Sequence, residues 1–241
     1  MQPAPFTKQC HGKPRRGVVF YFCGWKTPFW VYRPVFFIMN MAGYRVVAYS
    51  LAENNILIGN NGGLVDQVKE LIRDVQSDVV GFQAQGVSYF AAFGNSLGSE
   101  LALTVTKQVP EVSGVVLNTV RGSTSEFIWH APYAVGFKKL YETRSYTEAR
   151  MYNELKIVEA TEGLNKLGKR PVLLYYSKAD TTILPSNTEI LVKALAAHHI
   201  HHKVIRNRYL GHFMASAKNH LAFWTWLGFL RKQERRVRTN S

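Results

Sequence analysis

The sequence predicts an α/β fold, with a mostly parallel sheet of about six strands and helices on both faces. Two observations predict it. Short, nearly continuous apolar runs, typical of strands buried on both faces, alternate along the chain with segments of helical periodicity. Polar residues suited to catalysis then follow the ends of several of these runs. At 241 residues, 46% of them hydrophobic, the chain is long enough to form one domain with a full core.

The predicted strands comprise residues 17–23, 45–50, 88–94, 112–118, 171–177 and 202–208. The connecting helices are expected near residues 32–42, 63–77, 97–109, 186–199 and 213–232. The second helix, for example, has one apolar face formed by Leu64, Val68, Leu71, Ile72 and Val75. Strands and helices that alternate in this way favour a parallel sheet, which binds its ligands at the carboxyl ends of the strands.

Residues 94–98, Gly-Asn-Ser-Leu-Gly, carry the most informative motif, because they fit the pattern G-x-S-x-G. They lie between a short apolar run and a helical segment that Pro110 ends. A tight turn from strand to helix exposes the hydroxyl of Ser96 at the end of the sheet, and the first N–H groups of the helix point at whatever that hydroxyl attacks. The alternative is an ordinary Gly/Ser turn in an α/β domain.

A catalytic serine in this turn requires an acid and then a histidine further along the chain, each just after a strand. Asp180 follows the predicted strand at 171–177, and His212 follows the one at 202–208. The strand at 112–118 ends in Asn118 and offers no carboxylate. The order serine, acid, histidine is therefore present.

On these residues the chain resembles the α/β-hydrolase family of serine hydrolases, over roughly residues 17–232. The resemblance rests on the Ser96 motif, on Asp180 with the Ile-Leu-Pro at 183–185, and on Gly211-His212. It implies that Ser96 is the nucleophile, that His212 is the general base and then the acid, and that Asp180 orients the imidazole.

The resemblance also implies an oxyanion hole formed by the backbone N–H groups of Leu97 and Trp25. Trp25 belongs to the loop after the first predicted strand. Relatives often carry His-Gly there, whereas this chain has Cys23-Gly24. Backbone donors need no particular side chain, so this departure affects recognition more than mechanism.

The resemblance divides the chain into an N-terminal tail at 1–16, a hydrolase core at 17–118 and 169–232, and a basic C-terminal tail at 233–241. So short an N-terminal segment predicts that the family's initial antiparallel hairpin is absent. Residues 119–168 interrupt the alternation and predict a helical cap, or lid, over the site. The segment is rich in aromatic side chains: Phe127, Trp129, Tyr133, Phe137, Tyr141, Tyr146 and Tyr152. The alternative is a set of ordinary surface helices.

The formal net charge is +14 and the isoelectric point is about 9.8. Such a charge attracts an anionic substrate, a membrane surface or nucleic acid, unless it serves only to solvate the surface. No nucleic-acid-binding motif accompanies it, which argues against nucleic acid. The sequence leaves the oligomeric state open.

No apolar run reaches the ~18 residues of a membrane span, and the first residues do not resemble a secretory signal. Two cysteines, Cys10 and Cys23, do not form a disulfide framework, so we expect reduced thiols and a cytoplasmic location, the alternative being a bridge between the two. The histidines at 198, 199, 201 and 202 adjoin in sequence and would seldom converge on one metal ion. We predict neither a metal nor a cofactor.

The predicted function is hydrolysis of an acyl bond in a small-molecule substrate, most favourably a carboxylic ester, through an acyl-enzyme on Ser96. The same machinery serves a thioesterase, an acyltransferase or a C–C bond hydrolase. Asn95 before the serine is similar to the last class, but that class's His-Gly-x-Gly loop is absent. A different alternative is a non-catalytic protein of this fold that binds an anionic partner.

Overall fold

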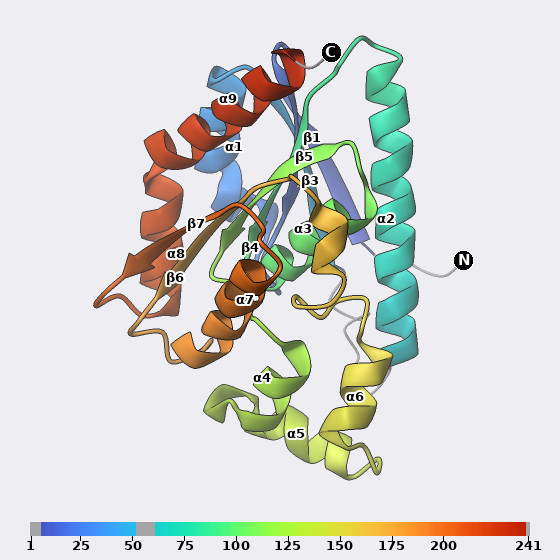
Figure 1. Cartoon of the computed structure of the whole chain (residues 1–241), viewed down its shortest axis with the longest axis vertical. Helices are drawn as coiled ribbons and strands as arrows, with labels where there is room; N and C mark the ends of the chain where they lie inside the picture. Colours follow the sequence, from blue (N-terminus) through green and yellow to red (C-terminus); the bar gives the residue numbers. More distant parts are fainter. Residues whose placement is uncertain (1–5, 52–60, 240–241) are drawn as a thin grey trace.

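A computed structural model describes residues 6–51 and 61–239 (Figure 1). Its sheet has seven strands within these residues, in the order β1-β3-β2-β4-β5-β6-β7. All neighbouring strands pair in parallel except β1 and β3, which are antiparallel. The strands are β1 (Phe6–His11), β2 (Gly17–Phe22), β3 (Tyr44–Leu51), β4 (Phe90–Asn95), β5 (Val112–Asn118), β6 (Val172–Ser177) and β7 (His202–Asn207).

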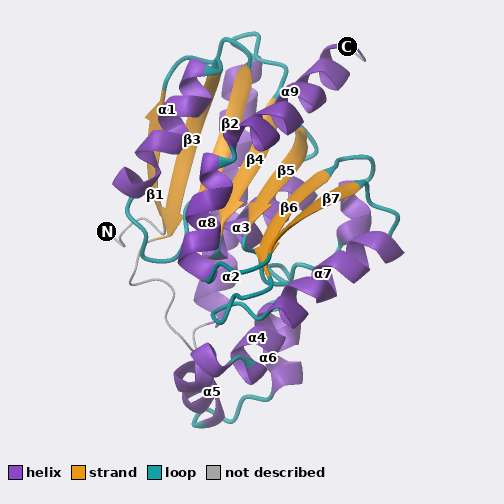
Figure 2. Ribbon diagram, turned by 90° about the vertical axis from the view of Figure 1, so that its left-hand side faces the viewer, coloured by secondary structure: helices purple, strands orange, loops and turns teal. Residues whose placement is uncertain are grey.

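Helices cover both faces of the sheet (Figures 1 and 2). One face packs against α1 (Arg33–Met41), α8 (His212–Leu221) and α9 (Phe223–Thr239), and the other against α2 (Asn61–Gln83), α3 (Leu97–Gln108) and α7 (Pro185–Ala197). The pleat explains this division. In β2, Val18 and Phe20 belong to the core under α2 and α3, whereas Val19 and Tyr21 belong to the core under α1 and α9. The predicted α/β-hydrolase architecture, with a mostly parallel sheet between helices, is confirmed.

The prediction that residues 1–16 form only a tail is wrong, because Phe6–His11 form an antiparallel edge strand. Most of its side chains are exposed, so the sequence shows no alternation of apolar and polar residues. Contacts far along the chain stabilise the strand instead. Lys8 lies 2.8 Å from Asp74 and 2.7 Å from Asp78 of α2, and Phe6 packs edge-on against Tyr49. Residues 1–5 lie outside the described residues.

The C-terminal segment also differs from the prediction. The single helix expected at 213–232 is two helices, which meet at Ala222. The segment predicted as a basic tail continues α9 to Thr239, and residues 240–241 lie outside the described residues. Glu234 explains this extension, because its buried carboxylate accepts hydrogen bonds from Arg16 and Tyr44 and pairs with Arg238 at 3.0 Å. These contacts hold the last turns of α9 against β3 and the residues just before β2.

Residues 119–168 form five short helices: α4 (Thr124–His130), η3 (Pro132–Ala134), α5 (Val135–Glu142), α6 (Glu148–Glu154) and η4 (Leu164–Leu167). Of these, α4, α5 and α6 lie at one end of the molecule (Figure 1), whereas η4 contacts α3. A further 3₁₀ helix, η1 (Phe29–Tyr32), precedes α1. The fully buried carboxylate of Glu159 accepts hydrogen bonds from the backbone N–H groups of Thr124 and Ser125, which begin α4. No helix among the described residues is long and apolar enough to cross a membrane.

Candidate active site

Ser96 lies in the turn between β4 and α3, with a φ angle of 52° and a ψ angle of −124°. This is a strained conformation for a residue with a side chain. The flanking glycines make the turn feasible. A Cβ atom on Gly94 would collide with the backbone of Gly98, and one on Gly98 would collide with the carbonyl of Phe22. The N–H of Ser96 donates to the carbonyl of Asn118 at 2.8 Å, which fixes the turn against β5.

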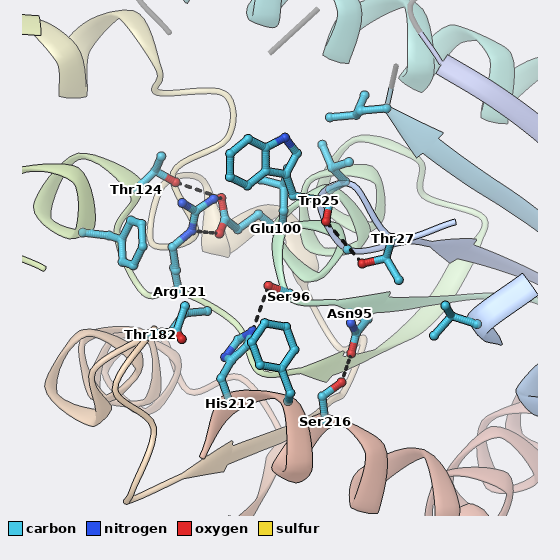
Figure 3. A pocket seen from close by; sticks show the side chains of 18 of the residues that line it. Trp25, Thr27, Asn95, Ser96, Glu100, Arg121, Thr124, Thr182, His212 and Ser216 are labelled. Atoms are coloured by element: carbon cyan, nitrogen blue, oxygen red, sulfur yellow. Dashed lines mark hydrogen bonds and ion pairs between the residues drawn. The ribbon is translucent and has the colours of Figure 1, made fainter. Parts of the chain in front are cut away.

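The structure brings Ser96, His212 and Asp180 into one hydrogen-bonded chain. Ser96 Oγ lies 3.2 Å from His212 Nε2 (Figure 3), and His212 Nδ1 lies 2.8 Å from Asp180 Oδ2. The imidazole and the carboxyl group are both buried. The second oxygen of Asp180 accepts the backbone N–H groups of Thr182 and Ile183, each at 2.9 Å. The carboxylate is thus fixed at both oxygens, and one of them faces the imidazole.

Leu97 is the first residue of α3, so its N–H has no acceptor within the helix. Trp25 follows β2, and both residues line the same cavity as Ser96. The phenol oxygen of Tyr32 accepts the N–H of Gly24 and the side-chain amide of Asn95, each at 3.0 Å. The loop that carries Trp25 is therefore attached to the residue next to the serine. The sequence did not predict this contact, because Tyr32 lies at the start of the helix expected near residues 32–42 and nothing in its pattern points to a partner in the Trp25 loop.

The cavity that contains Ser96 has a volume of about 590 Å³ and a predominantly apolar lining. One part of it lies between α1 and α8 and is lined by Val31, Pro34, Ile38, Phe213, Ala217 and Leu221. Another part lies against residues 119–168 and is lined by Phe127, Ile128, Phe137, Tyr141, Leu155 and Val158. Of the seven aromatic residues noted in that segment, Phe127, Tyr133, Phe137 and Tyr141 line the cavity.

No protein-family model matches the sequence, and no curated protein matches it. The folded chain does resemble solved structures. A monoacylglycerol lipase of Paleococcus ferrophilus is 14% identical, with a TM-score of 0.64 over 93% of this chain and 99% of that one. A butyrate-bound esterase of Thermogutta terrifontis is 17% identical, with a TM-score of 0.66 over 96% and 89%. Esterase B of Lactobacillus rhamnosis is 15% identical, with a TM-score of 0.66 over 95% and 80%.

The chain has the α/β-hydrolase fold. At these identities the comparisons establish the fold alone. In α/β hydrolases the ends of the strands carry the functional groups, and here Trp25, Ser96, Asp180 and His212 all follow the carboxyl ends of parallel strands.

Beside Ser96, this α/β-hydrolase core buries a set of neutral polar side chains that we call the amide cluster. Asn95 Oδ1 accepts from Ser216 and from Asn118, and Asn118 Oδ1 accepts from Asn219, at 2.6, 2.9 and 2.8 Å. The cluster comprises Tyr32, Asn95, Asn118, Asn207, Ser216, Asn219 and His220. It links β4, β5 and β7 to α8, the helix that begins with His212. Burial lowers the pKa of His220 to about 4, so its ring is neutral at pH 7.

On the other side of Ser96 lies a set of largely buried polar and charged side chains, which we call the carboxylate cluster: Glu100, Lys107, Arg121, Thr124 and Glu159. Figure 3 shows Glu100, Arg121 and Thr124 of this set. Arg121 makes a two-point ion pair with the buried Glu100, one contact of which measures 2.7 Å, and Thr124 donates to the same carboxylate at 2.9 Å. Lys107 donates to two carbonyls of residues 159 and 162. Burial raises the pKa of Glu100 and lowers that of Lys107 to about 8.

The remaining sequence features lie away from this site. Cys10 is exposed and Cys23 buried, and both are free thiols. The histidines at 198, 199 and 201 lie in the connection from α7 to β7, and His202 begins β7. Among residues 6–51 and 61–239, no three His, Cys, Asp or Glu side chains gather in a way that could hold a metal ion.

Proposed function

We propose that the chain is a serine hydrolase that cleaves carboxylic esters with an apolar acyl group. The observation that carries the proposal is the hydrogen-bonded chain from Ser96 through His212 to Asp180, which opens into an apolar cavity. A serine hydroxyl becomes a nucleophile when a base removes its proton, and an imidazole held by a carboxylate is such a base. The esterase and lipase names of the structural neighbours support the same substrate class.

In the proposed reaction, Ser96 Oγ attacks the ester carbonyl while His212 Nε2 takes its proton. The N–H groups of Leu97 and Trp25 stabilise the oxyanion, and the protonated imidazole then delivers its proton to the leaving alcohol. Water, deprotonated by His212, releases the acid from the acyl-enzyme. Asp180 orients the imidazole and stabilises the imidazolium while it carries the proton.

Residues 119–168 act as a lid in this proposal. Their helices contribute Phe127, Phe137 and Tyr141 to the cavity, and Phe137 packs against Trp25 with ring centroids 5.8 Å apart. An apolar wall next to the oxyanion donors excludes water and selects the acyl group.

The test measures hydrolysis of p-nitrophenyl esters of increasing acyl length, with labelling by a fluorophosphonate probe. Ser96→Ala should lower kcat by at least about 10³-fold and abolish labelling. Its melting temperature should stay the same or rise, because the strained turn is retained for chemistry rather than packing. Labelling that persists in this variant would identify another nucleophile. Parallel assays with thioesters would show which acyl bond the site prefers.

Asp180→Asn provides the second arm of the test. The amide favours the wrong imidazole tautomer, so kcat should fall by about 10²–10⁴. Asp66→Asn is the matched control, because Asp66 is exposed on α2 and pairs with Lys69 at 3.3 Å. A fully active Asp180→Asn variant would rule out Asp180 as the acid.

A further inference from the structure

Large apolar side chains are exposed on two helical segments that border the cavity, one formed by η1 and α1 and the other by α8 and the start of α9. On η1 and α1 they are Trp30, Val31, Phe37 and Met41, and on α8 and the start of α9 they are Phe213, Met214, Leu221 and Trp224. We call these eight residues the entrance surface. Their exposed fractions range from 43% to 79%. Scattered exposed apolar residues are ordinary, but eight large ones on segments that border one cavity mark a site of contact with another apolar phase.

The two segments face each other across the cavity mouth. Val31 and Pro34 line the cavity from η1 and α1, and Phe213 and Leu221 line it from α8. At the floor between the helices, the rings of Tyr32 and His220 lie 5.7 Å apart. Figure 2 shows α1 and α8 on the same face of the sheet. The exposed surface therefore continues directly into the cavity that contains Ser96.

Charge distinguishes this face from the rest of the molecule. Residues 1–52 and 190–233 contain no Asp or Glu, and η1, α1 and α8 all belong to these stretches. Exposed cations adjoin the entrance surface at Lys26, Arg33 and Lys218. Within the described part of the chain, no carboxylate forms an ion pair with any of the three. An anionic surface would complement this face.

We propose that the entrance surface docks on a lipid–water interface that carries anionic headgroups. Tryptophan and other large apolar side chains enter the headgroup region of a bilayer, and neighbouring lysines and arginines strengthen the contact with anionic lipids. Docking places the cavity mouth at the interface, so a lipid ester reaches Ser96 without crossing water. That last step rests on the proposed function, but the docking does not.

A second copy of the chain fits the surface less well. Such a pairing would bring Arg33 and Lys218 of one copy against the same cations of another, and like charges at an interface oppose association. A lipid surface with anionic headgroups satisfies the apolar and the basic parts of the face together.

The test measures binding to vesicles of ether-linked phosphatidylcholine with or without ether-linked phosphatidylglycerol, by co-sedimentation and tryptophan fluorescence. Ether lipids contain no ester bond, so binding is measured apart from hydrolysis. We expect the chain to bind the mixed vesicles, with a blue shift of the emission from Trp30 and Trp224, and to bind pure phosphatidylcholine more weakly. No binding to the mixed vesicles would overturn the proposal.

Phe37→Ser combined with Trp224→Ser tests the apolar part, because both side chains are exposed and neither lines the cavity. The affinity for mixed vesicles should fall by at least about tenfold, while hydrolysis of soluble p-nitrophenyl butyrate stays unchanged. Val80→Ser is the matched control, because Val80 is similarly exposed on α2, on the other face of the sheet. An equal loss in the control, or no loss in the double variant, would contradict the proposal.

Lys218→Glu tests the basic part. It should weaken binding to mixed vesicles by about fivefold or more and leave binding to phosphatidylcholine unchanged. Lys193→Glu, on α7, is the control. If Lys218→Glu left the affinity for mixed vesicles unchanged, the proposal that the surface recognises anionic headgroups would be overturned.

Light scattering measures whether the chain forms a dimer. If the wild type were a dimer and the Phe37→Ser, Trp224→Ser double variant a monomer, a second copy would cover the surface, and this would also overturn the proposal. A wild-type protein that binds vesicles but hydrolyses no soluble ester would contradict only the proposed function.

Discussion

The amide cluster and the carboxylate cluster lie on opposite sides of Ser96 and are built from different chemistry (Figure 3). The amide cluster joins strand ends to α8 through neutral donors and acceptors. The side chain of Asn118, for example, makes hydrogen bonds with Asn95, Ser216 and Asn219. The carboxylate cluster joins α3 to residues 119–168 through buried charges, chiefly Glu100 with Arg121. Neutral networks need only complete pairing, whereas buried charges also need their partners to stay ionised.

Each side buries one basic group whose pKa is lowered, so stability should rise with pH on both sides, but over different pH ranges. The unfolded pKa of a histidine is 6.5, and His220 in the folded chain has a pKa of about 4. Protons therefore bind the unfolded chain first as the pH falls, and the amide side loses stability between those values. Lys107 has a folded pKa of about 8 against 10.5 unfolded. The folded chain loses this proton first as the pH rises, so the carboxylate side gains stability over that range.

The largest expected effect comes from removing the ion pair between Arg121 and Glu100 in the carboxylate cluster. Arg121→Ala leaves the buried carboxylate of Glu100 without its cation, and removing one partner of a buried pair costs about 3–5 kcal/mol of unfolding free energy. Urea denaturation measures it. Arg150→Ala is the control, because that guanidinium pairs with Glu154 at the surface, at 3.0 Å, and its loss should change stability little. Equal effects of the two substitutions would mean that the carboxylate cluster does not secure residues 119–168.

The next prediction concerns the acid limb. Between pH 7 and about pH 4.5 the wild type should lose about 2 kcal/mol more stability than His220→Gln, which cannot titrate. Glutamine keeps an oxygen that can accept from Tyr21, whose hydroxyl lies 2.8 Å from His220 Nε2. Urea denaturation of both proteins at the two pH values gives the difference. If the wild type and His220→Gln lost the same unfolding free energy between the two pH values, the neutral form of His220 would not stabilise the amide cluster.

The alkaline limb has the same sign, because the unfolded chain again binds more protons than the folded chain. Between pH 7 and about pH 9.5 the wild type should gain about 2 kcal/mol relative to Lys107→Gln, because the wild-type amine sheds its buried charge. Glutamine retains a donor for the carbonyls of Glu159 and Glu162. The same denaturation series measures the gain. A relative loss of stability in the wild type would mean that Lys107 is held as a cation by the carboxylate cluster.

How far the sequence predicts these features depends on how local their causes are. The turn at Ser96, with its two glycines, is specified by neighbouring residues, and the ends of parallel strands then bring Asp180 and His212 to it. Asn219 could not be assigned in this way, because an isolated asparagine usually lies in a turn on the surface. Asn95, Asn118 and Asn207 lie at or near the ends of predicted strands, but their contacts with one another and with α8 depend on segments far apart in the sequence. The strand at Phe6–His11 was missed because it depends on ion pairs of Lys8 with residues on α2.

The smallest expected effect tests whether the amide side also serves the proposed chemistry. Tyr32→Phe removes the oxygen that accepts the N–H of Gly24 and the amide of Asn95. The loop that carries Trp25 then has one anchor fewer, and its N–H is less well aimed at the oxyanion. Removing an oxyanion donor outright costs about 10²–10³ in turnover, so loosening one should lower kcat by about tenfold, with KM nearly unchanged. Steady-state hydrolysis of p-nitrophenyl butyrate separates the two constants.

Tyr21→Phe is the matched control for this prediction. Tyr21 belongs to the same core and its ring lies 5.1 Å from that of Tyr32, but its hydroxyl contacts His220 and no backbone group of the loop. It should lower stability to a similar extent, since each substitution removes a buried hydroxyl from its hydrogen bonds, and it should leave kcat near the wild-type value. If both variants lost kcat equally, the amide cluster would act through general rigidity, and the contact of Tyr32 with Gly24 would have no separate part in positioning the oxyanion hole.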